Sequence, residues 1–141
     1  MTLPDVNVWL ALISNLHSHH RAALEWFDGM GAQEANFCRI TQLSLLRLLT
    51  NAKVMGTDAL SQREAWSVFQ TFSADFRVAF LMEPEQVERQ WRRFSSLPSP
   101  SPNQWADGYL AAFASECGLT LVTFDQGFRM YRGLRCVILQ P

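Results

Sequence analysis

The sequence has a single lysine, Lys53, and only three cysteines among its 141 residues. Cys38, Cys117 and Cys136 lie far apart and form no C-x-x-C pair, which argues against a disulfide framework and against a zinc site. No run of about 18 uninterrupted apolar residues occurs, so the sequence predicts no membrane span. The net charge of −1 excludes a global electrostatic preference for nucleic acid, so any nucleic-acid site has to be local. Sparse, unpaired cysteines also favour a reducing, cytoplasmic location.

The chain is rich in apolar residues: 48% of its residues are hydrophobic and 18% are charged. A chain of 141 residues has the size of one domain, and residues 1–141 are expected to form it around one core. The composition is typical of a compact domain that keeps some apolar surface for a partner.

Short apolar runs alternate along the chain with segments of helical periodicity. The run "LTLVTF" is apolar almost throughout, which is typical of a strand buried on both faces. The alternation predicts an α/β fold with a parallel sheet flanked by helices. Strands are expected over residues 1–5, 35–40, 78–84, 119–124 and 136–140, and helices over residues 6–15, 17–30, 41–51, 61–76, 85–97 and 103–117.

Polar residues predict where two of these helices begin. Thr41 is placed to cap the helix over residues 41–51. Ser101, followed by Pro102 and then by Gln104, has the pattern of a capping box at the start of the last long helix.

The helix over residues 61–76 carries a stripe at helical spacing that is expected to face either the core or a partner. The stripe comprises Ala65, Phe69, Phe72 and Phe76, with Trp66 beside it.

Three acidic residues are placed near one edge of the predicted sheet. Asp5 follows the first strand, Asp125 follows "LTLVTF", and Asp107 lies near the start of the helix before that strand. Ligands of such sheets bind outside the carboxyl ends of the strands, so we expect the three carboxylates to converge there. Converging carboxylates repel one another unless a cation is present, and Mg²⁺ or Mn²⁺ accepts oxygen ligands alone. Each acid also has an ordinary role open to it, as a helix cap, a solvated helix residue or a turn.

Four fragments, in this order along the chain, resemble the PIN-domain ribonucleases, and specifically the VapC-type toxins of bacterial toxin–antitoxin pairs. They are "LPDVNVWLAL", "RITQLSLLRLLTN", "WADGYLAAFA" and "LVTFDQGF". The resemblance implies a single PIN-like domain, a parallel sheet flanked by helices, that hydrolyses RNA at an acidic Mg²⁺ site, with Mn²⁺ also possible. It further implies a cognate antitoxin protein as partner, a homodimer, and no contact with a membrane.

The resemblance also assigns roles to single residues. Asp5, Asp107 and Asp125 match the family's acids, and would be both metal ligands and catalytic residues. Asn7 and Thr123 occupy positions that support the acids by hydrogen bonding in relatives.

The chain departs from the family at one position. Many relatives carry a glutamate near the start of the third helical region, where this chain offers only Gln42 and Ser44. Either residue could occupy the position, and both are neutral. Three negative charges instead of four favour one well-held ion, joined by a second when the substrate phosphate arrives.

Arginines are the expected source of contacts to RNA phosphates. The candidates are Arg47, Arg129 and Arg132, with Arg92, Arg93 and Arg135 as further arginines on predicted surface segments. Arg47 interrupts an apolar helix face, so it could instead pair with a core acid.

Three histidines, His17, His19 and His20, gather near the start of the second helix. We expect them to have surface or capping roles and not to form a metal cluster.

Two other functions stay open from the sequence. A catalytically weak PIN-like module would bind RNA or a protein partner without cleavage, and the missing glutamate favours it. A phosphatase of the haloacid-dehalogenase type would use Asp5 as its nucleophile. That chemistry needs an aspartate where Asn7 stands and a well-placed lysine, and the context of Lys53 is poor.

Overall fold

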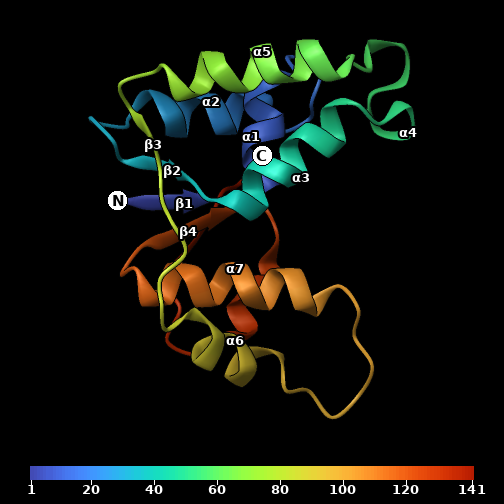
Figure 1. Cartoon of the computed structure of the whole chain (residues 1–141). Coiled ribbons are helices and arrows are strands. Elements are labelled where there is room, and N and C mark those ends of the chain that lie inside the picture. Colours follow the sequence, from blue (N-terminus) through green and yellow to red (C-terminus); the bar gives the residue numbers. More distant parts are fainter.

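The computed structural model describes the whole chain, residues 1–141, as a five-stranded sheet covered by helices. All neighbouring strands are parallel, in the order β3-β2-β1-β4-β5. The chain builds outward from β1 to β2 and β3, then returns to the other side of β1 for β4 and β5 (Figure 1). The strand order therefore reverses between β1 and β4. The strands are β1 Thr2–Pro4, β2 Ala35–Phe37, β3 Val78–Phe80, β4 Thr120–Thr123 and β5 Cys136–Ile138.

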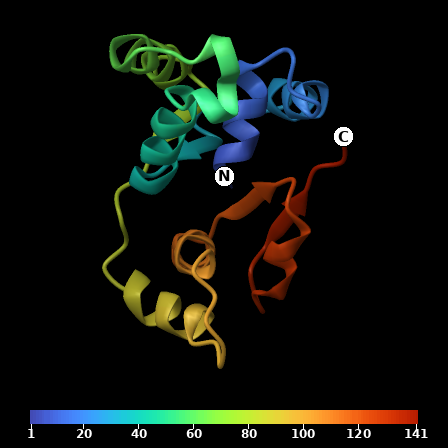
Figure 2. The same ribbon diagram turned by 90° about the vertical axis from the view of Figure 1, so that its right-hand side faces the viewer.

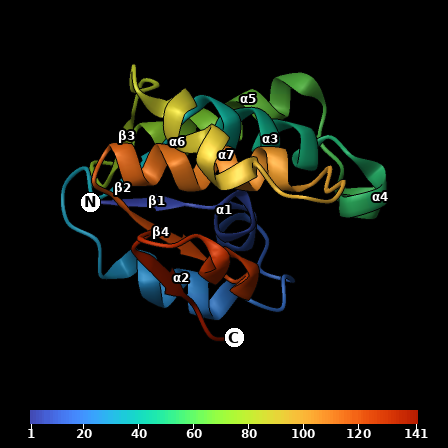
Figure 3. The ribbon, with the colours of Figure 1, turned by 90° about the horizontal axis from the view of Figure 1, so that it is seen from below.

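Helices cover both faces of this sheet, as the alternating pattern predicted. In Figure 1, α1, α2 and α5 lie on one side of the strands and α6 and α7 on the other; Figures 2 and 3 show α6 beside α7. The α-helices are α1 Val6–Ile13, α2 His20–Asp28, α3 Arg39–Leu49, α4 Ala52–Met55, α5 Gln62–Ser73, α6 Val87–Ser95 and α7 Gln104–Glu116. Two 3₁₀ helices, η1 Gly56–Asp58 and η2 Gln126–Met130, complete the fold. None of the helices has the length and apolar character needed to span a bilayer.

Buried apolar side chains join the sheet to both helical layers. On the α1 side, Phe37 of β2 stacks on Trp9, with ring centroids 3.9 Å apart and ring planes 13° apart. On the opposite side, Leu3 and Leu121 pack with Phe113 of α7 in one buried cluster. The aromatic stack fixes β2 against α1, and the close packing of the second cluster fixes the relative positions of β1, β4 and α7. The carboxyl ends of these two strands are therefore held by the core.

Pro4 is compatible with the central strand because of where the ladder stops. On the β4 side the pairing continues to Pro4↔Val122, and the next backbone N–H, that of Asp5, donates to the Val122 carbonyl at 2.8 Å. On the β2 side the pairing is limited to Thr2↔Ala35. Successive N–H groups of a strand point to alternate sides, so the missing N–H of Pro4 faces the side where no ladder bond is made.

The predicted start of the third helix is wrong by two residues. α3 begins at Arg39 behind an N-cap at Cys38, and Thr41 occupies the third helical position. The Thr41 hydroxyl accepts a hydrogen bond from the Cys38 backbone N–H at 3.1 Å, which closes a capping box from inside the helix. The second strand is correspondingly shorter than predicted and ends at Phe37.

Ser101 is not the cap that its spacing predicted. α7 begins at Gln104, and its N-cap, Asn103, makes no side-chain hydrogen bond. The Gln104 N–H donates instead to the backbone carbonyl of Ser101 at 3.0 Å, so a turn of main chain leads into the helix.

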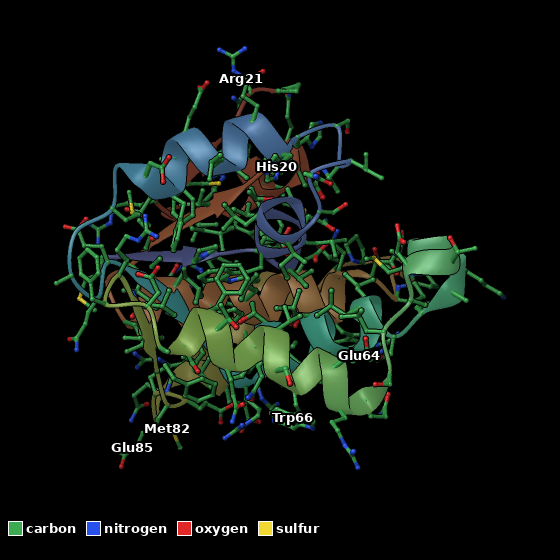
Figure 4. All side chains as sticks on the ribbon, turned by 90° about the horizontal axis from the view of Figure 1, so that it is seen from above. His20, Arg21, Glu64, Trp66, Met82 and Glu85 are labelled. Carbon is green, nitrogen blue, oxygen red and sulfur yellow. The ribbon has the colours of Figure 1, made fainter.

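The predicted stripe on the fifth helix is only partly buried. Ala65 and Phe69 lie in the core, whereas Phe76 is 69% exposed. The helix ends at Ser73, so Phe76 no longer shares the helical face that its spacing suggested. Trp66, beside the stripe, projects from α5 on the side away from the strands (Figure 4).

Candidate metal centre between β1 and β4

Asp5 is the first residue after β1, and both of its carboxylate oxygens are held. The Val6 backbone N–H donates to Oδ1 at 2.6 Å, so Asp5 is the N-cap of α1. The Thr123 hydroxyl, from the end of β4, donates to Oδ2 at 3.1 Å. Capping therefore accounts for one oxygen of Asp5, and the second oxygen faces the neighbouring strand.

Thr123 links two of the acidic residues. Its side chain is buried, and its hydroxyl oxygen accepts a hydrogen bond from the Asp125 backbone N–H at 3.0 Å while donating to Asp5. Asp125 is exposed, and its Oδ1 accepts a hydrogen bond from the Gly127 N–H at 2.7 Å at the start of η2. The end of β4 thus fixes Asp125 beside the carboxylate that follows β1.

Asp107 reaches the same edge from the first turn of α7. The helix precedes β4 and packs antiparallel to it, so it begins at the edge where the strands end (Figure 1). Asp107 is half-buried; its negative charge contributes to the raised pKa of Asp5, and the charge of Asp125 contributes to the raised pKa of Asp107 itself. Three segments distant in sequence therefore bring one carboxylate each to the point where the strand order reverses.

Burial and mutual repulsion disfavour the negatively charged forms of the acids at this edge. Burial raises the pKa of Asp5 to about 6, although hydrogen bonds from Thr123 and Val6 lower it; the negative charges of Asp107 and Asp125 add to the rise. Burial also raises the pKa of Asp107, with the charge of Asp125 as the second cause. None of the four ion pairs in the structure involves these acids. No arginine, lysine or histidine is ion-paired with these acids to offset the repulsion.

The donor set matches a hard divalent cation. It consists of carboxylate oxygens only, and Mg²⁺ commonly takes one or two carboxylates and completes its shell with water and substrate phosphate. The side chains as they stand do not form a group of three or more His, Cys, Asp or Glu around one metal position. Water and substrate phosphate would therefore have to complete the shell of an ion held at this edge.

A PIN-domain family model matches residues 2–134, which is nearly the whole chain. The chain belongs to the PIN-domain family. It is 46% identical over 144 residues to ribonuclease VapC41 of Mycobacterium tuberculosis, with 99% of each chain covered. It is also 30% identical over 132 residues to ribonuclease VapC38 of the same organism, covering 90% of this chain and 86% of that one.

Solved structures share the PIN fold with the chain at low sequence identity. The VapC20 toxin of Mycobacterium tuberculosis, described as cleaving the sarcin–ricin loop, superimposes with a TM-score of 0.72 and 16% identity over 100% of both chains. The VapBC2 complex of Rickettsia felis, bound to promoter DNA, gives 0.68 and 13% identity over 99% of this chain and 98% of that one. These likenesses confirm the predicted α/β fold, and the family model and the 46%-identical relative confirm the resemblance to VapC-type PIN domains.

The two residues considered for the family's glutamate position lie on different faces of α3. Gln42 is buried, and its Oε1 accepts a hydrogen bond from Arg39 Nη1 at 2.5 Å. Ser44 is half-buried and lies one turn after Ile40, which lines a surface hollow together with Trp105 and Tyr109 of α7. Ser44 is therefore the one on the helix face toward α7. Asn7 is exposed in the first turn of α1.

The predicted RNA-contacting arginines are dispersed. Arg129, in η2, lies close enough to Cys136 to act on its pKa, as does Asp5, so it is near the acidic edge. Arg132 is exposed just beyond η2. Arg47 lines a surface groove between α3 and α5 together with Trp66, and it forms no ion pair. The expectation that it could pair with a core acid is therefore wrong.

The histidines pack on the α1–α2 connection. His17 Nδ1 accepts a hydrogen bond from the His19 N–H at 3.1 Å, and the His19 ring lies 4.2 Å from that of Phe124. His20 Nδ1 lies 2.7 Å from the Ala11 carbonyl. Local hydrogen bonding and packing account for the three residues.

Tyr131 belongs to the site but was missed from the sequence. It is buried, its hydroxyl donates to Gln104 Oε1, and burial raises its pKa to about 12, with smaller contributions from the charges of Asp107 and Asp125. It follows a segment with no regular periodicity, so no sequence signal marks it. Only the folding of η2 against α7 brings it beside the acids.

Proposed function

We propose that this chain is a Mg²⁺-dependent endoribonuclease that acts as the toxin of a toxin–antitoxin pair, hydrolysing RNA phosphodiester bonds. One observation carries the proposal: the Thr123 hydroxyl links Asp5 to Asp125 at the carboxyl edge of β1 and β4, the negative charges of Asp107 and Asp125 contribute to the raised pKa of Asp5, and none of the three acids is in an ion pair. The 46% identity to a named VapC ribonuclease over nearly the full length of both chains supports the same conclusion.

The chain's own residues would have separate tasks in this reaction. Asp5 and Asp107 would hold the ion, and the hydrogen bond from Thr123 keeps Asp5 oriented toward it. Asp125, which is exposed and fixed by the Gly127 N–H, would orient the attacking water. The bound ion would supply a lowered pKa for that water and charge neutralisation for the phosphate oxygens. Mn²⁺ would support the same chemistry.

The neutral residues on α3 favour one well-held ion at this site. With Ser44 on the face toward α7, three carboxylates carry all the negative charge, and a second ion would be held weakly until substrate phosphate adds oxygen ligands.

The proposed partners are RNA, a cognate antitoxin and a second copy of the chain, in the cytoplasm. Leu43 and Trp66, which are 56% and 52% exposed, form an apolar surface on α3 and α5 that suits a homodimer. Structural neighbours such as VapBC2 of Rickettsia felis are toxin–antitoxin complexes, which supports an antitoxin partner for this chain.

A comparison of wild type with Asp5→Asn tests the proposal. Wild type is expected to cleave single-stranded RNA with Mg²⁺ and to stop growth when expressed alone, whereas Asp5→Asn does neither. Asp58→Asn is the matched control, because Asp58 is an exposed acid on η1 with no ion pair, and it is expected to behave as wild type. Equal cleavage by wild type and Asp5→Asn would refute the assignment of the site.

A PIN-like module that binds RNA or protein without cleavage is the second candidate. Two observations favour it: the neutral residues on α3, and the absence of three side chains grouped around one metal position. Titration with Mg²⁺ and Mn²⁺ separates the two functions. A wild-type protein that binds neither ion, and leaves RNA intact, would support the binding module.

A further inference from the structure

A surface cavity lies beside the acidic edge and not within it. Its volume is about 700 Å³, and it is formed by α6 and the segment that leads from α6 into α7. Trp91 and Trp105 line it, together with serines of the connecting segment. We call this cavity, bounded by α6 and residues 95–105, the α6–α7 groove.

Trp105 is the exposed aromatic surface of this groove. It is 58% exposed, and it also lines a neighbouring apolar hollow with Ile40 and Tyr109. The indole is positioned by its neighbours: Trp91 packs edge-on against it at 6.4 Å, and Trp91 Nε1 donates to the Trp105 carbonyl at 2.9 Å. A flat aromatic face is thus held open to solvent.

The charged side chains that line the groove are Arg92 and Glu88. Two further arginines, Arg89 and Arg93, lie on α6 outside this lining. Arg92 lines the groove and is paired with Glu88 at 2.7 Å, but both side chains are exposed, so the pair is weak and free to exchange. Aromatic faces interleaved with arginines and hydroxyls are the composition of surfaces that bind single-stranded nucleic acid.

The groove is continuous with the acidic edge. Gln104 lines the groove and accepts the hydrogen bond from Tyr131, whose pKa is raised in part by the charges of Asp107 and Asp125. Gln104 lies three residues before Asp107 and therefore shares its face of α7, and Trp105 follows Gln104 in the same turn. A strand whose phosphate lies at the acids therefore has its neighbouring nucleotides within reach of the groove.

From this geometry we infer that the α6–α7 groove binds the single-stranded RNA next to the scissile phosphate, with one base stacked on Trp105. The inference rests on the proposed function and deepens it by naming a substrate subsite. Arg92 holds the backbone, and the serines and Gln104 offer hydrogen bonds to the base edges.

Binding without cleavage is the first test. A fluorescein-labelled single-stranded RNA of twelve nucleotides is titrated with protein in EDTA, and anisotropy gives Kd. Trp105→Ala is expected to raise Kd by about 5- to 150-fold, whereas Trp105→Phe keeps most of the affinity. Phe76→Ala is the control, because it removes an aromatic side chain that is 69% exposed beyond α5, and its Kd is expected to equal that of wild type.

Two further readouts separate stacking from a structural role. Addition of unlabelled RNA is expected to quench tryptophan fluorescence in wild type and to quench it less in Trp105→Ala. RNAs with one abasic position are expected to bind wild type more weakly only when the missing base is the one that stacks on Trp105. In Trp105→Ala this difference is expected to disappear. Circular dichroism melts of the variants exclude misfolding as the cause.

The outcomes distinguish the groove from the nuclease proposal. If RNA binding depends on Trp105 but the protein cleaves no RNA with Mg²⁺, the nuclease proposal is refuted and the groove proposal is supported. Cleavage with unchanged Kd and KM in Trp105→Ala overturns the groove alone. If Trp105→Ala binds RNA normally but no longer binds a co-expressed protein partner, the groove is a site for that partner and the RNA proposal is overturned. A wild-type protein that binds no RNA overturns both proposals.

Discussion

Thr123 joins Asp5 and Asp125 through one buried hydroxyl. Replacement by valine keeps the shape but leaves the Asp125 N–H and one oxygen of Asp5 without this partner. Thr123→Val is expected to lower the free energy of unfolding by about 1–3 kcal/mol and to weaken Mg²⁺ binding. Denaturant unfolding and calorimetric titration measure the two effects. Thr123→Ser, which keeps the hydroxyl, is the control, and equal losses in both variants would mean that the methyl group matters instead.

Asp5 is expected to make the metal-free protein less stable at neutral pH than at acidic pH. Burial raises its pKa from 3.8 to about 6, so between these values the native state keeps a proton that the unfolded chain has released. The contribution of Asp5 to the free energy of unfolding therefore falls as pH rises through this window. In EDTA, Asp5→Asn is expected to become more stable relative to wild type as the pH rises. The difference between their melting temperatures, variant minus wild type, is expected to increase from pH 4 to pH 7.

Mg²⁺ should reverse this difference at pH 7, because the ion binds the native carboxylates of wild type and not the amide of the variant. A melting temperature that rises equally with Mg²⁺ in both proteins would place the ion elsewhere.

At the scale of elements, two serines that look alike in sequence have different roles. Ser61 caps α5: its Oγ accepts from the Glu64 N–H at 3.1 Å, and Glu64 Oε1 accepts from the Ser61 N–H at 3.2 Å. Ser101 makes no such box, because α7 begins behind Asn103. Ser61→Ala is expected to cost about 1 kcal/mol of stability and Ser101→Ala close to none. Equal effects in denaturant unfolding would contradict the assigned helix starts.

At the scale of the whole molecule, the exposed apolar surface on α3 and α5 bears on assembly. Trp66 projects outward from α5, and Met82 lies on a different segment of the surface (Figure 4). Trp66→Glu is expected to convert the proposed dimer to a monomer, since burying an unpaired carboxylate at an apolar contact is costly. Met82→Glu, at a residue that is 75% exposed, is expected to leave the dimer intact. Light scattering coupled to size exclusion measures both, and a Trp66→Glu dimer would move the interface elsewhere.

The order of strands and helices followed from local patterning, because hydrophobic periodicity and turn residues act over a few neighbours. The apolar run of β4 predicted a strand buried on both faces, and Leu121 and Val122 are both buried. The errors came at the ends of elements, where competing caps differ by little energy. Thr41 and Ser101 each had the right residue type, but the main chain entered the helices elsewhere.

The sequence by itself determined which residues follow β1 and β4, and hence that Asp5 and Asp125 lie at the carboxyl edge of a parallel sheet. Only the tertiary structure decided that the Thr123 hydroxyl bridges them, that Tyr131 donates to Gln104 of α7, and that Trp105 opens onto a groove beside the acids. The physical reason is range: periodicity reports contacts between near neighbours, whereas these contacts depend on how α7 and η2 pack against the sheet.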